Sequence, residues 1–174
     1  EHPDAKIHVI DSLSAGGEVD LLVRKLNHLV AEGLDFDQVV DAITAYQSKT
    51  KLLFVLAKVD NLVKNGRLSK LVGTVVGLLN IRMVGEASKT GTLELLQKAR
   101  GQKKAIKAAF DELIKAGYTG GHITIAHRNN DKFIEQFSAL VREKFAQASI
   151  EVLPTSGLCS FYAEEGGLLM GYEI

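Results

Sequence analysis

Apolar residues recur every three or four positions in several stretches of this chain, which is the spacing of amphipathic helices. Asp35 is followed three residues later by Gln38, a capping-box pattern that places the start of one helix. Gly117 follows another such stretch and marks its end. The pattern predicts helices at 19–30, 36–46, 105–114 and 133–145.

Shorter β-branched or apolar runs predict strands between these helices. The run 52–56 is apolar throughout, which is typical of a strand covered on both faces. The runs 81–84 and 92–96 flank a Ser-Lys-Thr-Gly turn and predict a hairpin. Further strands are predicted at 7–10, 122–127, 150–153 and 167–174, with a helical turn near 60–67 and an apolar helix at 68–79.

The order of these elements predicts one α/β domain over residues 1–174, a layered mixed β-sheet flanked by helices. The 174 residues can bury a core without disulfides or metal. Cys159 is the one cysteine, which excludes an internal disulfide and a thiolate zinc cluster.

The charge and composition of the chain exclude some classes of function. Lys and Arg number 21, as do Asp and Glu, so the formal net charge is zero, and a global basic field for nucleic acid is excluded. No apolar run is long enough for a membrane helix, so we expect no membrane span. A single cysteine fits a reducing compartment, and we expect a cytoplasmic protein. The chain begins Glu-His-Pro-Asp without Met, and we expect a piece of a longer protein.

The histidines and the cysteine do not by themselves indicate a metal site or a catalytic site. His122 and His127 bracket one predicted strand five residues apart, so they lie on opposite faces and cannot hold one metal ion from that strand. Neutral histidines at strand ends are the favoured interpretation, and no metal or cofactor is expected. Cys159 is interpreted as a small buried apolar residue, because the sequence places no histidine base beside it.

Several polar motifs have both a functional and a structural interpretation. Gly16-Gly17 opens a helix after a predicted strand, as a phosphate-binding loop would, but no phosphate-binding lysine follows. Arg67, ahead of an apolar helix, could bind a carboxylate or phosphate at the mouth of an apolar cleft, or could lie on the surface and cap a helix. The adjacent Glu164 and Glu165 are interpreted as part of a loop, since their side chains diverge.

Taken in order, these pieces resemble the DegV family of bacterial fatty-acid-binding proteins. The resemblance runs from about residue 7 to the C-terminus, and its most specific piece is Asp-Asn-Leu followed by Gly-Arg-Leu-Ser. The matching stretches are 9–12, 60–62, 66–69, 78–82, 98–104 and the glycine-rich closing strand.

Members of that family resemble a clamp in which two α/β domains hold a long-chain fatty acid. This chain resembles the larger, C-terminal domain, which implies that an N-terminal domain is missing here. The resemblance also implies that hydroxyl side chains of that missing domain hold much of the fatty-acid carboxylate.

The resemblance implies roles for particular residues of this chain. Arg67 matches an arginine in the polar network around the carboxylate. A partner fatty-acid kinase, which phosphorylates the carboxyl group, would dock on a basic surface of Arg100, Lys103 and Lys104. The cluster 98–104 can equally be a solvated helix edge. The complete set of expected ligand-binding residues is Arg67, Ser69, Ile81, Met83 and Tyr162.

The chain departs from the family pattern in its last loop, where many members have a histidine. Here the stretch is Phe-Tyr-Ala-Glu-Glu-Gly-Gly, and Tyr162 is the expected substitute because a phenol can donate to a carboxylate.

The sequence leaves two hypotheses for the function of this chain. The favoured one is a non-catalytic lipid carrier that presents a fatty acid to a kinase. The alternative is a phosphoryl-transfer enzyme using Gly16-Gly17 for phosphate and Asp11 for a metal.

Overall fold

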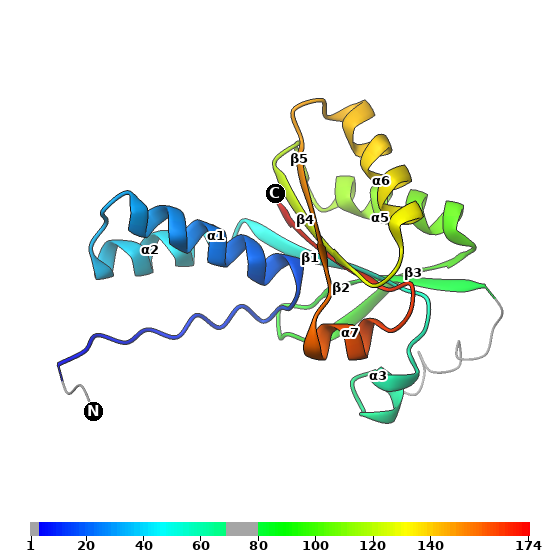
Figure 1. The fold of residues 1–174 in the computed structure, drawn as a ribbon, viewed down its shortest axis with the longest axis horizontal. Helices are drawn as coiled ribbons and strands as arrows, with labels where there is room; N and C mark the ends of the chain where they lie inside the picture. Colours follow the sequence, from blue (N-terminus) through cyan, green and yellow to red (C-terminus); the bar gives the residue numbers. More distant parts are fainter. Residues whose placement is uncertain (1–3, 69–79) are drawn as a thin grey trace.

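The computed structural model describes residues 4–68 and 80–174, which form a mixed β-sheet with helices on both faces (Figure 1). The six described strands lie in the order β3-β2-β1-β6-β4-β5. β4 and β5 are parallel, and the other neighbouring pairs are antiparallel. Their bounds are β1 Thr50–Leu56, β2 Ile81–Ala87, β3 Leu93–Arg100, β4 His122–His127, β5 Ser149–Pro154 and β6 Leu168–Glu173. The predicted α/β fold class is confirmed.

The four helices predicted from apolar periodicity are all present. The capping box is also confirmed, because the Asp35 carboxylate accepts from the backbone N–H of Gln38 at 2.9 Å and the Gln38 side chain accepts from the Asp35 backbone at 3.0 Å. The described helices are α1 Gly17–Ala31, α2 Phe36–Gln47, α3 Asp60–Lys64, α5 Gln102–Lys115, α6 Asp131–Lys144 and α7 Gly157–Ala163.

Helices α5 and α6 cover one face of the sheet, which we call the closed face (Figure 1). Leu53 and Val55 of β1 point to this side, where they join an apolar core that includes Leu113 of α5 and Phe137 of α6. Both helix side chains are fully buried. The apolar stripe of each helix therefore lies against the sheet, as the periodicity predicts.

The alternate residues of β1 face the opposite side of the sheet, which we call the groove face. Phe54 and Leu56 belong to a smaller apolar core there, together with residues of α3 and α7. This arrangement confirms that β1 is covered on both faces. The hairpin of α1 and α2 begins where the first turn of α1 crosses the sheet, extends past its edge and packs around its own small core of Leu22, Leu29 and Ile43 (Figure 1).

Three predictions of secondary structure need comment. The strand predicted at 7–10 is wrong: residues 5–10 form no helix or strand, and Ile7 and Val9 are 82% and 81% exposed. A strand needs a neighbour for its backbone hydrogen bonds, and none of the described strands lies beside this segment. The loop expected after Pro154 contains helix α7, and of the helix predicted at 68–79 all but Leu68 lies outside the described residues.

Candidate ligand-binding groove

A hollow of about 660 Å³ opens on the groove face, and we call it the apolar groove. Its floor is formed by side chains of the two central strands, Leu52, Phe54 and Leu56 of β1 and Leu169 of β6. One side consists of α7 together with Leu62, Gly66 and Arg67 at and after α3. The opposite side consists of segment 11–15 and of residues in 87–93, the connection between β2 and β3.

The floor depends on a glycine in the neighbouring strand. Phe54 lies opposite Gly85 in the antiparallel register of β1 and β2. A Cβ atom at Gly85 would lie 2.3 Å from the Phe54 ring and 2.2 Å from the backbone oxygen of Glu94. The absent side chain therefore makes room for the aromatic ring beneath the groove.

Segment 11–15 is held in place by the α1–α2 hairpin. The Gln47 side chain at the end of α2 donates to the backbone oxygen of Asp11 at 2.6 Å. Within the segment, the Ser12 hydroxyl accepts from the backbone N–H of Ser14 at 3.3 Å. The Ser14 hydroxyl lines the groove and is buried without a partner among the described residues.

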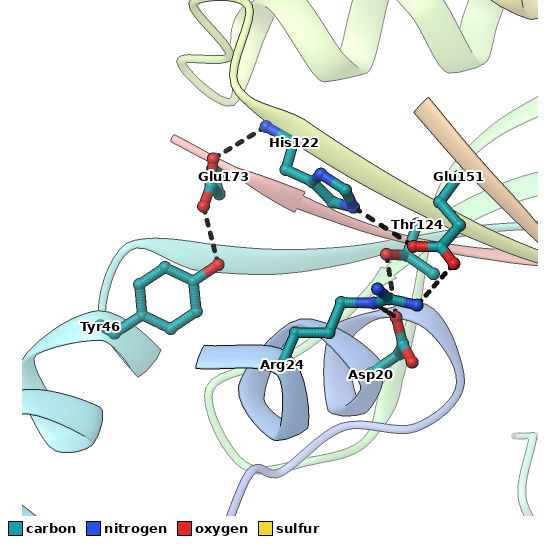
Figure 2. Close-up of polar contacts among 7 residues, drawn as sticks. All are labelled: Asp20, Arg24, Tyr46, His122, Thr124, Glu151 and Glu173. Atoms are coloured by element: carbon teal, nitrogen blue, oxygen red, sulfur yellow. Dashed lines mark hydrogen bonds and ion pairs between the residues drawn. The ribbon is translucent and has the colours of Figure 1, made fainter. Parts of the chain in front are cut away.

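Two polar clusters fasten this hairpin to the sheet (Figure 2). In the first, Arg24 of α1 pairs with Asp20 at 2.6 Å and with Glu151 of β5 at 2.5 Å. The Thr124 hydroxyl of β4 donates to the same Asp20 at 3.2 Å. These contacts connect α1 to the β4–β5 side of the sheet.

In the second cluster, Glu173 of β6 accepts from the Tyr46 hydroxyl at 2.7 Å and from the backbone N–H of His122 at 2.8 Å (Figure 2). Burial, and then the bond to Glu173, raise the pKa of Tyr46 above its ordinary value. The phenol therefore remains a donor at neutral pH. The first cluster therefore ties α1, the helix that begins after segment 11–15, to the sheet, and the second ties α2.

Two hydrogen bonds join α7 to α3 across the opposite side of the groove. The Glu164 carboxylate accepts from the backbone N–H of Asn61 at 2.8 Å. The Asn61 side chain donates to the backbone oxygen of Phe161, also at 2.8 Å. The carboxylate of Glu164 is thus engaged with the first turn of α3. Glu165 instead contacts Arg128 and Asn129 on the β4–α6 connection.

The structure brings two of the predicted ligand-binding residues to the groove, where Arg67 is exposed and Tyr162 is half-buried. Met83 and Ile81 pack in the apolar core of the groove face, with Met83 buried beneath it. Ser69 lies outside the described residues. The predicted partner-binding residues Arg100, Lys103 and Lys104 are exposed where β3 ends and α5 begins, and their role stays a prediction.

Sequence reasoning missed most of the walls of the groove. Cys159 lines the groove from α7 and is only half-buried. The hydroxyl-rich turn between β2 and β3, with Thr90 and Thr92 in the wall, was recognised only as a hairpin. The alternation of Ser12 and Ser14 after a predicted strand is the signal that could have indicated a polar wall at segment 11–15.

The glycines of the alternative, phosphate-binding hypothesis have a packing role. A Cβ atom at Gly17 would lie 2.2 Å from the backbone oxygen of Thr124 and 2.6 Å from the backbone nitrogen of Gly171. The first turn of α1 therefore lies directly on the backbones of β4 and β6, which accounts for glycine at positions 17 and 171. His122 and His127 lie near different carboxylates, Glu151 and Asp131, each at 3.8 Å.

A second hollow of about 730 Å³, lined mostly by polar residues, adjoins the apolar groove and shares with it Ser12, Leu13, Leu52, Ala87 and Thr90. Glu18 lines it, is buried, and accepts from the Thr50 hydroxyl at 2.8 Å. An amphiphilic molecule could therefore contact the apolar groove and the polar hollow at the same time.

In the described ranges, no three metal-ligating side chains converge.

Residues 1–172 match the family described as "Uncharacterised protein, DegV family". This chain belongs to the DegV family. Over its full length it is 78% identical to a DegV domain-containing protein of Streptococcus pneumoniae and 66% identical to one of Streptococcus pyogenes. It spans 62% of the length of each of these relatives.

Solved structures agree with this assignment. The Fatty Acid Kinase (Fak) B3 protein of S. pneumoniae, loaded with linoleic acid, is 78% identical, with a TM-score of 0.97 over 99% of this chain and 62% of that one. A DegV family protein of Eubacterium eligens, loaded with heptadecanoic acid, is 37% identical, with a TM-score of 0.95 over the same shares. Among the described residues of our chain, no helix has the length and apolar character needed to cross a membrane.

Proposed function

We propose that this DegV family protein binds a long-chain fatty acid in the apolar groove without catalysing a reaction. The observation that carries the proposal is the pairing of an apolar floor with Arg67 and Tyr162 in the same groove. Arginine presents a rigid fork that suits a carboxylate, and a phenol can donate to one. The fatty acids bound by the relatives from S. pneumoniae and E. eligens support the same ligand class.

Different parts of the groove contribute affinity and selectivity. Each methylene that leaves water contributes about 0.8 kcal/mol, so the acyl chain over Phe54, Leu56 and Leu169 supplies most of the affinity. The polar residues orient the ligand and select an acid over an alcohol. Glu164 does not oppose the carboxylate directly, since its own carboxylate is bonded to the backbone of Asn61.

We further propose that the bound carboxyl group is presented to a fatty-acid kinase, which would phosphorylate it. The name of the S. pneumoniae relative, a Fatty Acid Kinase B protein, supports this partner. Arg100, Lys103 and Lys104 form an exposed basic edge that could meet an acidic kinase surface. A further domain that completes the lipid site stays a prediction from the family resemblance, and a cytoplasmic location stays a prediction from the composition of the chain.

The proposal is tested by extracting lipid from the purified protein at its full natural length and measuring fatty acids by mass spectrometry. We expect about one fatty acid per chain, and a large loss of it in Arg67→Ala. Arg142→Ala is the matched control, because Arg142 is exposed on α6, across the sheet from the groove. A protein that stays free of lipid after incubation with fatty acids would overturn the proposal.

The kinase role needs its own experiment. Replacing Arg100, Lys103 and Lys104 together by Ala should weaken binding to the cognate fatty-acid kinase while fatty-acid content stays unchanged. Lys132→Ala, an exposed lysine on α6, is the control. Equal kinase affinity in the triple variant and the control would remove this surface from the proposal.

A further inference from the structure

We propose that Glu164 is a positioning residue that holds α7 against α3 and so limits how fast a fatty acid leaves the groove. This inference rests on the proposed lipid-binding function. Its evidence is separate, because it concerns the backbone of one residue and the contacts of one short helix.

Glu164 has an unusual backbone conformation for a residue with a side chain. Its φ is 53° and its ψ is −173°, a region that is populated almost only by glycine. Such a conformation persists where the surrounding structure holds it, and these residues cluster at ligand clamps. A glycine would relieve the strain but would lack the contacts that the glutamate side chain makes.

The side chain contributes a link between two elements that are distant in sequence. Its carboxylate accepts from the backbone N–H of Asn61 at 2.8 Å, over a separation of 103 residues. Asn61 returns a second bond from its side chain to the Phe161 backbone oxygen in α7 at 2.8 Å. A bond to a charged acceptor is stronger than one between neutral groups, so Glu164 is the main polar tie of this pair.

The backbone of Glu164 is also engaged on both sides. Its N–H donates to the Ser160 oxygen at 3.2 Å, which closes the last turn of α7. Its carbonyl accepts from the N–H of Gly167 at 3.2 Å, just before β6 begins. Glu164 thus connects the end of α7, the start of β6 and the first turn of α3.

Helix α7 depends on such ties because it has little apolar anchorage of its own. It is seven residues long, and only Ala163 in it is buried. Leu158 is 68% exposed and Phe161 is 45% exposed. Nevertheless α7 supplies Cys159, Tyr162 and Ala163 to the groove. Loss of the tie at Glu164 would leave α7 held by the Asn61 and Arg128 contacts with its backbone, so this side of the groove would move more readily.

The adjacent Glu165 provides a matched control in the same loop. It is exposed, and its carboxylate contacts Arg128 at 3.6 Å and Asn129 at 3.1 Å rather than α3. Glu165 reaches α7 only through Arg128, which donates to the Ser160 oxygen at 3.2 Å, so its removal should affect α7 less than removal of the direct tie at Glu164. Glu164→Ala and Glu165→Ala remove the same charge from neighbouring positions. A general effect of charge on the groove would therefore appear in both variants.

The test measures the release of a fluorescent fatty acid by stopped-flow displacement, using the protein at its full natural length. We expect Glu164→Ala to release the ligand roughly tenfold faster, since a factor of ten corresponds to one such bond. Glu164→Gln keeps an acceptor for Asn61 and should recover most of the wild-type rate. Glu164→Gly relieves the strain but lacks the bond, so it should release fast without a loss of thermal stability.

Hydrogen exchange gives a second readout that needs no ligand. Backbone amides of α7 should exchange faster in Glu164→Ala than in Glu165→Ala. Equal release rates and equal α7 exchange in these two variants would overturn the inference. If the wild-type protein bound no fatty acid, the proposed function would fail, and the exchange comparison alone would decide whether Glu164 positions α7. If Glu164→Ala failed to fold, Glu164→Gly, which also lacks the bond to Asn61 but relieves the backbone strain, would replace it.

Discussion

The two faces of the sheet are built from the same strands and differ in how they are covered. On the closed face, α5 and α6 bury a continuous apolar core with the strand residues between them. On the groove face, short helices and irregular segments surround two hollows and are joined largely by hydrogen bonds. Leu13 and Glu164, both in these irregular segments, have positive φ values.

This difference teaches how one sheet can separate stability from binding. Along β1, Leu53 and Val55 contribute to the closed face, whereas Phe54 and Leu56 contribute to the groove face. The side chains of the closed face can pack densely, because no ligand enters between them. The groove face keeps open apolar surface, and polar ties rather than dense packing hold its walls.

The largest expected effect is a substitution on the closed face. Phe137→Ala removes a fully buried ring between α6 and the sheet and should cost about 3–5 kcal/mol of unfolding free energy. Leu169→Ala, on the groove floor, should cost far less stability, because Leu169 is only half-buried, yet it should reduce fatty-acid affinity. Denaturant unfolding and lipid titration of both variants test this contrast. A similar loss of stability in both would break the distinction between the faces.

The sequence predicted the closed face better than the groove face, for a physical reason. Helices α5 and α6 have a regular apolar stripe because they pack on a flat sheet, and such periodicity is visible in sequence. The walls of the groove come from segments far apart in the chain, such as 11–15, 87–93 and α7, which carry no common period. The local pattern of glycine, arginine and an apolar helix indicated Arg67 as one of two alternatives, whereas Tyr162 depended on a family resemblance and Cys159 was interpreted as a buried apolar residue.

The strand wrongly predicted at 7–10 and the helix α7 that was not predicted have a common cause. Residues 7–10 have the composition of a strand, but a strand depends on a partner that local sequence does not specify. Helix α7 is short and is stabilised by contacts of Asn61 and Arg128 with its backbone, not by an apolar stripe. In both segments, distant contacts decide the conformation and local propensity does not.

The second prediction concerns the crossing of α1 over the sheet. Gly17→Ala would place a methyl group against the backbones of Thr124 and Gly171, which cannot move as a side chain can. We expect a loss of about 3 kcal/mol of unfolding free energy, which is at the upper end for overpacking and would be measured by denaturant unfolding. Gly33→Ala, in open space but at a φ of +79°, should cost about 1 kcal/mol from backbone strain alone. If Gly17→Ala were as mild as Gly33→Ala, the glycine pair would need another explanation, and phosphate binding should be tested.

A smaller effect is expected at the polar hollow. Thr50→Val removes the hydroxyl that donates to the buried Glu18 carboxylate, leaving a buried acceptor without this partner. The expected cost is about 2 kcal/mol of unfolding free energy. Thr44→Val, on the exposed side of α2, is the control and should be nearly neutral. Differential scanning calorimetry of the two variants measures the difference. An unchanged Thr50→Val would mean that Glu18 finds an equivalent partner in the hollow.

The smallest expected effect distinguishes the faces by their response to alkaline pH. Burial raises the pKa of Tyr118, on the closed face, to about 12 from its ordinary 10.0, and its hydroxyl donates to the backbone oxygen of Gly121. The folded protein therefore retains this proton to higher pH than the unfolded chain, so the stabilisation is complete below pH 10 and declines as pH rises toward about 12. Urea unfolding at about pH 8 and about pH 11 should show a smaller decline in Tyr118→Phe than in the wild type. An identical decline in both would assign the alkaline sensitivity to other groups. Tyr172 on the closed face and Tyr46 in the α1–α2 hairpin would be tested next, because burial raises the pKa of each.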